Sequence, residues 1–276
     1  MVEIFIAYAV LGAFAGIMAG LLGVGGGLII VPVLVFLWQP EFSGGEQLGG
    51  SQTVQLAIGT SLAVIVFTSL SSVRAHHLRK SVLWPVVWKL TPGILVGAWL
   101  GAALASVMPQ NMLKITFGLF ELLVAAQMSF SLRRASQAPH QELSGTLVSG
   151  IGMGLAGIVI GAVSALVGIG GGTLTVPFLN ACKVRMQQAI GTSAACGLPI
   201  AVGGALSYLI LGWNHEALPV ASMGYVYGPA LLGIAVTSVL FAPLGANLAH
   251  RLPTSTLKKV FAGFLALLGL WMLASF

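Results

Sequence analysis

The composition of this chain of 276 residues is that of a membrane protein. Hydrophobic residues make up 57% and charged residues only 7% of the sequence, and the mean hydropathy is +1.01. Because soluble globular domains carry about 25% charged residues, a soluble domain is excluded. The net charge of +6 comes from 12 basic and 6 acidic residues, most of them in short breaks between apolar segments. This pattern indicates a lipid bilayer as the surroundings and no nucleic-acid partner.

Residues for catalysis or cofactor binding are sparse. The sequence contains no aspartate, no HExxH and no GxSxG, so we do not expect an enzyme. Cys182 and Cys196 show neither metal nor redox spacing, and we expect no cofactor and no metal.

Ten helical segments are predicted when the chain is divided at charges, Pro/Gly clusters and polar turns. Eight of them hold about 20 residues or more, enough to cross a hydrocarbon core of about 30 Å. These eight are 3–22, 52–73, 82–107, 110–131, 146–167, 187–211, 222–250 and 255–275. Two shorter segments, 27–38 and 172–181, would reach only about 15–20 Å, which is typical of half-helices.

Three blocks of the first half recur in the same order in the second half. LLGVGGGLIIVPVL (21–34) matches ALVGIGGGTLTVPFL (165–179), AIGTSLA (57–63) matches AIGTSAA (189–195), and LGAALASVMPQNMLKITF (100–117) matches LGANLAHRLPTSTLKKVF (244–261). An ordered triple match indicates an internal duplication. We predict a first repeat at 1–131, a cytoplasmic linker at 132–145 and a second repeat at 146–276.

The basic residues predict the orientation of the two repeats. With four crossings per half, the basic residues divide evenly between the two membrane faces. With five crossings per half, eleven basic residues fall on one face and only Lys114 falls on the other, together with Glu3, Glu41, Glu46 and Glu216. The positive-inside rule favours the second arrangement. The predicted fold is therefore an all-α polytopic membrane protein with two inverted repeats of about five helical segments each, and both termini outside.

A glycine triplet precedes each short segment. The triplets are Gly25, Gly26 and Gly27 in the first repeat and Gly170, Gly171 and Gly172 in the second. Free N–H groups and the positive end of a short helix favour an anion, and the missing Cβ atoms let a ligand approach the backbone. Inverted-repeat transporters bind substrate near the bilayer midplane between such broken helices. Tight helix packing through small residues is the alternative.

The second repeated block adds hydroxyl groups beside the glycines. It supplies Gly59, Thr60 and Ser61 in one half and Gly191, Thr192 and Ser193 in the other. We interpret these residues as candidate ligand donors, with hydroxyls bonded to the carbonyl one turn back as the alternative.

Glu121 is the one acidic residue deep inside a predicted span. A membrane-buried carboxyl group is a functional hypothesis, and a coupling proton carrier is the obvious role. The matching residue of the second repeat is Leu265. A carboxyl group facing a subunit interface or a neighbouring hydroxyl is the alternative.

These blocks resemble those of the sulfite exporter TauE/SafE family of membrane permeases. The shared pattern is a GxGGG-then-VP element and an AxGTS element in each half, joined by the basic linker near 132–145. The resemblance implies a secondary transporter, expected to be an exporter in the cell inner membrane, for a small sulfur-containing anion such as sulfite or sulfoacetate. It also implies that no prosthetic group is bound. An anion channel, or a permease for another small oxyanion such as thiosulfate, is the alternative, and a homodimer is left open.

Overall fold

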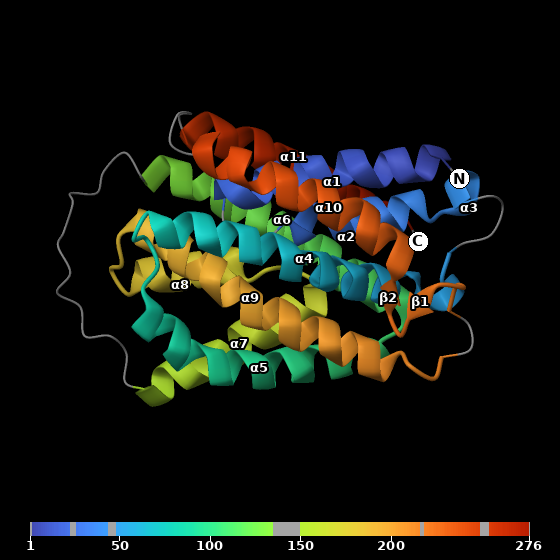
Figure 1. Ribbon diagram of the computed structural model, residues 1–276, viewed down its shortest axis with the longest axis horizontal. Coiled ribbons are helices and arrows are strands. Elements are labelled where there is room, and N and C mark those ends of the chain that lie inside the picture. Colours follow the sequence, from blue (N-terminus) through green and yellow to red (C-terminus); the bar gives the residue numbers. More distant parts are fainter. Residues whose placement is uncertain are drawn as a thin grey trace.

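The computed structural model describes residues 2–22, 26–43, 48–134, 150–215, 218–248 and 254–275. In chain order the elements are α1 (Val2–Leu22), α2 (Gly27–Leu37), α3 (Pro40–Ser43), η1 (Gly50–Gln52), α4 (Thr53–Leu78), α5 (Trp84–Val107), α6 (Gln110–Arg134), α7 (Gly150–Val167), α8 (Gly172–Ala181), α9 (Met186–Leu211), β1 (Ser222–Met223), β2 (Val226–Tyr227), α10 (Gly228–Leu248) and α11 (Thr254–Ala274). The helices form an elongated bundle with their long axes roughly aligned (Figure 1). An all-α polytopic membrane fold is thus confirmed. Among the described residues, α1, α4, α5, α6, α9 and α10 are long and apolar enough to cross a membrane.

Residues 222–250 were predicted to form one membrane-spanning helix, but the structure begins this region with a β-hairpin. In this hairpin Ser222 pairs with Tyr227 and Met223 pairs with Val226. Gly224, with φ 53°, supplies the positive backbone angle at the turn. The helix α10 therefore starts only at Gly228.

The helices of the two halves pack in matching pairs. α1 packs along α10 and α5 along α7, while α4 lies beside α9 and α6 beside α11. The first helix of each predicted repeat thus contacts the third long helix of the other repeat. Two structurally equivalent halves would pair in this way, and the inverted topology itself stays a prediction.

Glycines allow some of these helices to approach closely. Cβ atoms built on Gly93, Gly97 and Gly101 of α5 would overlap backbone carbonyl oxygens of α7. Small residues at such spacing let membrane helices pack backbone against backbone. Packing through small residues is thus the role of these glycines, which lie inside a regular helix.

The two ends of the bundle differ in charge. Both termini, α3 and the β1–β2 hairpin lie at one end, and α4 and α8 finish at the opposite end (Figure 1). The connections after α4 and α8 carry Arg79, Lys80, Lys183 and Arg185. At the end with the termini, the Nζ of Lys114 donates to the carbonyl of Ser275 at 2.8 Å. Which end faces the cytoplasm stays a prediction.

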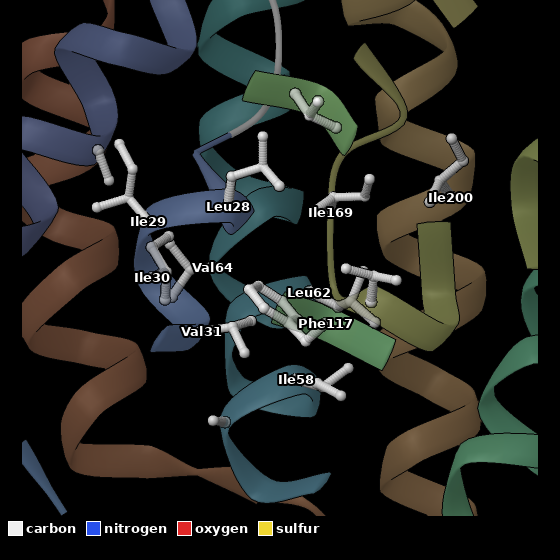
Figure 2. Packing of buried hydrophobic residues seen from close by; sticks show 14 of the residues in the cluster. Leu28, Ile29, Ile30, Val31, Ile58, Leu62, Val64, Phe117, Ile169 and Ile200 are labelled. Atoms are coloured by element: carbon white, nitrogen blue, oxygen red, sulfur yellow. The ribbon is translucent and has the colours of Figure 1, made fainter. Parts of the chain in front are cut away.

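An apolar cluster fills the centre of the bundle around the start of α2. Leu28 and Ile30 of α2 belong to one apolar cluster with Leu62 of α4, Phe117 of α6 and Ile169 (Figure 2). All five side chains are at most 1% exposed. The first turn of α2 is therefore held in place by hydrocarbon contacts.

Candidate functional site

Each short helix begins at a glycine in the left-handed conformation. Gly26 (φ 77°, ψ −13°) precedes α2, and Gly171 (φ 73°, ψ −13°) precedes α8. This region favours glycine because a Cβ atom is strained there. No side chain caps either helix start. The N–H groups of the third and fourth helical residues bond back to the carbonyl of Gly26 or Gly171, and those of the first two residues have no side-chain partner among the described residues. Gly25 lies outside the described residues.

The start of α2 packs against the backbone of the turn that precedes α8. A Cβ atom built on Gly27 would overlap the carbonyl oxygen of Gly168 and lie 2.9 Å from the Cα of Ile169. Gly168 is itself left-handed, with φ 75°, and its carbonyl accepts a hydrogen bond from the Ser61 hydroxyl at 2.9 Å. From this meeting point α2 runs toward the end that holds the termini, and α8 runs toward the opposite end (Figure 1).

The second triplet also packs closely against a long helix. A Cβ atom built on Gly197 of α9 would lie 2.7 Å from the carbonyl oxygen of Gly170. Gly172 is buried as the first residue of α8. The turn before α8 therefore packs against α9, where a Cβ atom built on Gly171 would overlap the side chain of Ile200.

The repeated threonines make two equivalent contacts between the predicted repeats. The Thr60 hydroxyl accepts a hydrogen bond from the backbone N–H of Tyr227 at 2.9 Å. In the other half, the Thr192 hydroxyl accepts one from the backbone N–H of Leu83 at 3.0 Å. Tyr227 precedes α10, and Leu83 precedes α5. We call these two contacts the threonine clasps.

The glycines beside these threonines allow the clasps to form. A Cβ atom built on Gly59 would overlap the carbonyl oxygen of Tyr225, and one built on Gly191 would lie 2.6 Å from that of Ser81. Thr60 also donates to the carbonyl of Leu56 at 2.7 Å. The Thr60 and Thr192 hydroxyls are thus engaged with the protein, as is Ser61.

Ser193 differs from its counterpart Ser61. Its side chain is fully buried, and its hydroxyl has no hydrogen-bond partner among the described residues. The residue that matches Gly168 in the first repeat is Gly23, which lies outside the described residues.

Two buried threonines on α8 were not foreseen as candidates. Thr173 is 7% exposed and Thr175 is 0% exposed, and neither hydroxyl has a hydrogen-bond partner among the described residues. The sequence could have identified these two threonines, because the matching positions of the first triplet block hold the apolar residues Leu28 and Ile30.

Glu121 is fully buried inside a single chain. Its exposed fraction is 0%, and neither carboxylate oxygen has a hydrogen-bond partner among the described residues. Its Cβ lies 3.1 Å from a Cβ atom built on Gly269, so the residue is at the contact of α6 with α11. A neighbouring hydroxyl partner and an exposed subunit-facing position, which were the alternatives, are not found among these residues.

A separate pocket in the described part of the chain is lined mostly by hydrocarbon. An apolar cavity of about 520 Å³ lies between α5, α6 and α7, with Thr116 as its one hydroxyl-bearing residue. Such a lining does not suit an anion. The described residues contain no cluster of three or more His, Cys, Asp or Glu side chains that could hold a metal ion.

Comparison with known proteins places the whole chain in one family. The family model described as sulfite exporter TauE/SafE matches residues 8–272. A "probable membrane transporter protein" of Haemophilus influenzae is 39% identical, with 95% of each chain covered. The "probable membrane transporter protein YunE" of Bacillus subtilis is 31% identical, with 96% of each chain covered. No solved structure matches the chain. The chain thus belongs to the sulfite exporter TauE/SafE family of membrane transporters.

Proposed function

We propose that this transporter is a secondary exporter of a small sulfur-containing anion, such as sulfite or a sulfoacetate-like organosulfonate, in the cell inner membrane. Membership of the TauE/SafE family supports membrane transport directly. The choice of anion and the direction of transport are our proposal. The observation that carries it is the pair of uncapped helix starts at Gly26 and Gly171, buried at the centre of the bundle.

The charge of the helix starts supports an anion as the substrate. The N-terminus of a helix carries about +0.5 of an elementary charge, so the two starts together offer about one positive charge. Their free N–H groups can donate hydrogen bonds to an oxyanion. Unpaired backbone of this kind persists at membrane depth only where it is buried or lines a cavity.

The candidate site residues are those of the two glycine triplets and of the second repeated block. The full set is Gly25, Gly26, Gly27, Gly59, Thr60, Ser61, Gly170, Gly171, Gly172, Gly191, Thr192 and Ser193. Within it, the clasp geometry supports a scaffolding role for Gly59, Thr60, Gly191 and Thr192. Contact with the anion is then proposed for the triplets and for Ser193.

We further propose that Glu121 carries a coupling proton. A buried carboxyl group with no hydrogen-bond partner is costly in its ionised form, and intramembrane acidic residues are characteristic of proton relays. The second half offers only the apolar Leu265 at the matching position, so this role would belong to one half.

Flux measurements on the purified protein in liposomes test the proposal. The panel consists of sulfite, sulfoacetate, thiosulfate, taurine and sulfate, each with and without a pH gradient. We expect saturable uptake and counterflow for a sulfur-containing anion. Large, non-saturating conductance would favour the anion channel, and selective thiosulfate uptake would favour the permease for another oxyanion. No flux of any of these anions above that of empty liposomes would overturn the proposal.

A further inference from the structure

The two glycine-capped helices differ in the side chains next to their uncapped starts. At matching positions of the aligned triplet blocks, α2 carries Leu28 and Ile30, and α8 carries Thr173 and Thr175. All four side chains are buried. One helix start is therefore lined by hydrocarbon, as Figure 2 shows for Leu28 and Ile30, and the other is lined by hydroxyl groups.

The hydroxyl groups on α8 lie close to its uncapped start. The Thr175 Oγ1 is 3.5 Å from the position of a Cβ atom built on Gly171. In a helix, a threonine hydroxyl commonly bonds the carbonyl four residues earlier, as Thr60 does with Leu56. Thr175 makes no such bond to Gly171, and its hydroxyl has no hydrogen-bond partner among the described residues.

A third hydroxyl reaches the same turn from the first half of the chain. The Ser69 Oγ of α4 lies 3.4 Å from a Cβ atom built on Gly197, and that position is 2.7 Å from the carbonyl oxygen of Gly170. The residue that matches Ser69 in the second repeat is Ala201. By contrast, the three atoms nearest to a Cβ atom built on Gly26 all belong to Ala15, its carbonyl oxygen at 3.1 Å and its Cβ at 3.3 Å among them, so no hydroxyl group is among them.

Fixed positive charges are remote from this turn in the described part of the chain. Every described lysine and arginine lies in a connection or within a few residues of the end of a long helix. The two deepest are Lys89, five residues after the start of α5 at Trp84, and Lys259, five residues after the start of α11 at Thr254. The available positive potential is then that of the helix starts, about +0.5 each. An anion with one charge is balanced by two such ends, whereas a dianion would bury an uncompensated charge at large cost.

We infer that the anion binds asymmetrically, against the start of α8, with Thr173 and Thr175 as hydroxyl donors. We infer also that the site selects a singly charged oxyanion head group, such as hydrogen sulfite or the sulfonate end of sulfoacetate, over a doubly charged head group such as sulfate. This inference rests on the proposed function. The start of α2 contributes its backbone and potential but no side-chain donor.

The test is inhibition of radiolabelled sulfite uptake in liposomes by methanesulfonate, with one charge, and by sulfate, with two. We expect methanesulfonate to inhibit at least tenfold more strongly than sulfate. Thr175→Val, which keeps the side-chain shape, should raise the KM for sulfite and the inhibition constant for methanesulfonate about tenfold or more. Thr175→Ser should restore both values. The matched control is Ile30→Val in α2, for which both constants should equal those of the wild type.

Three results would contradict the asymmetric anion site at α8 or its charge selectivity. Wild-type constants in both Thr173→Val and Thr175→Val, in a protein that transports sulfite, would overturn the assignment to α8 and leave the proposed function standing. Equal inhibition by sulfate and methanesulfonate would overturn the selection by charge. Absence of any sulfite uptake by the wild type would overturn the inference together with the proposed function.

Discussion

Removal of one hydroxyl from a threonine clasp should destabilise the protein more than it alters substrate affinity. Thr60→Val keeps the shape of a fully buried side chain but leaves the backbone N–H of Tyr227 without the acceptor that it now has at 2.9 Å. A buried N–H without a partner costs about 1–3 kcal/mol. For a chain of this size, about 2 kcal/mol corresponds to roughly 4–8 °C in the midpoint of thermal unfolding.

The matching variant Thr192→Val should show a loss of similar size, since it leaves the N–H of Leu83 unpaired. The measurement is thermal unfolding of the purified protein in detergent, followed by tryptophan fluorescence. Thr60→Ser should retain most of the stability. Thr116→Val is a control, because within the described part of the chain the Thr116 hydroxyl bonds only the carbonyl of Met112 in its own helix. An unchanged midpoint together with a large rise in KM would refute the clasp and return Thr60 and Thr192 to the role of ligand donors.

Two further predictions concern sidedness and coupling. Cys182 is partly exposed and Cys196 is fully buried, so an impermeant maleimide should label Cys182 alone and only from the cytosolic side. Labelling of Cys182 from outside in intact cells would contradict the inverted arrangement. Glu121→Gln removes the titratable group, so it should abolish the response of transport to a pH gradient while anion exchange continues; an unchanged response would show that Glu121 carries no coupling proton.

Hydropathy and glycine placement were sufficient to predict most helices of the fold. The start of α2 at Gly27 and of α8 at Gly172 followed from the triplets, because proline and glycine limit where a regular helix can begin. The hairpin at 222–227 was missed because its residues carry no charge and lead directly into the apolar sequence of α10. Its turn depends on the positive φ of Gly224, which hydropathy does not encode.

The contacts of the candidate site were harder to predict than its location. Thr60 finds its N–H partner 167 residues away in the chain, so only the tertiary fold identifies the clasp. By contrast, the difference between Thr175 and Ile30 was visible in the aligned blocks. It became meaningful once the burial of both side chains and the unpartnered Thr175 hydroxyl were known.

The most direct test of an anion site at the glycine-capped helix starts is counterflow of radiolabelled sulfite in liposomes containing Gly26→Ala, Gly171→Ala or Gly263→Ala. Gly26 and Gly171 have φ values of 77° and 73°, which strain any L side chain, whereas a Cβ atom at Gly263 meets nothing within 4 Å. The account predicts at least about tenfold slower counterflow for the first two variants at equal reconstitution, and wild-type counterflow for Gly263→Ala. Wild-type KM and counterflow in both Gly26→Ala and Gly171→Ala would contradict it, because the triplets would then serve only to pack helices.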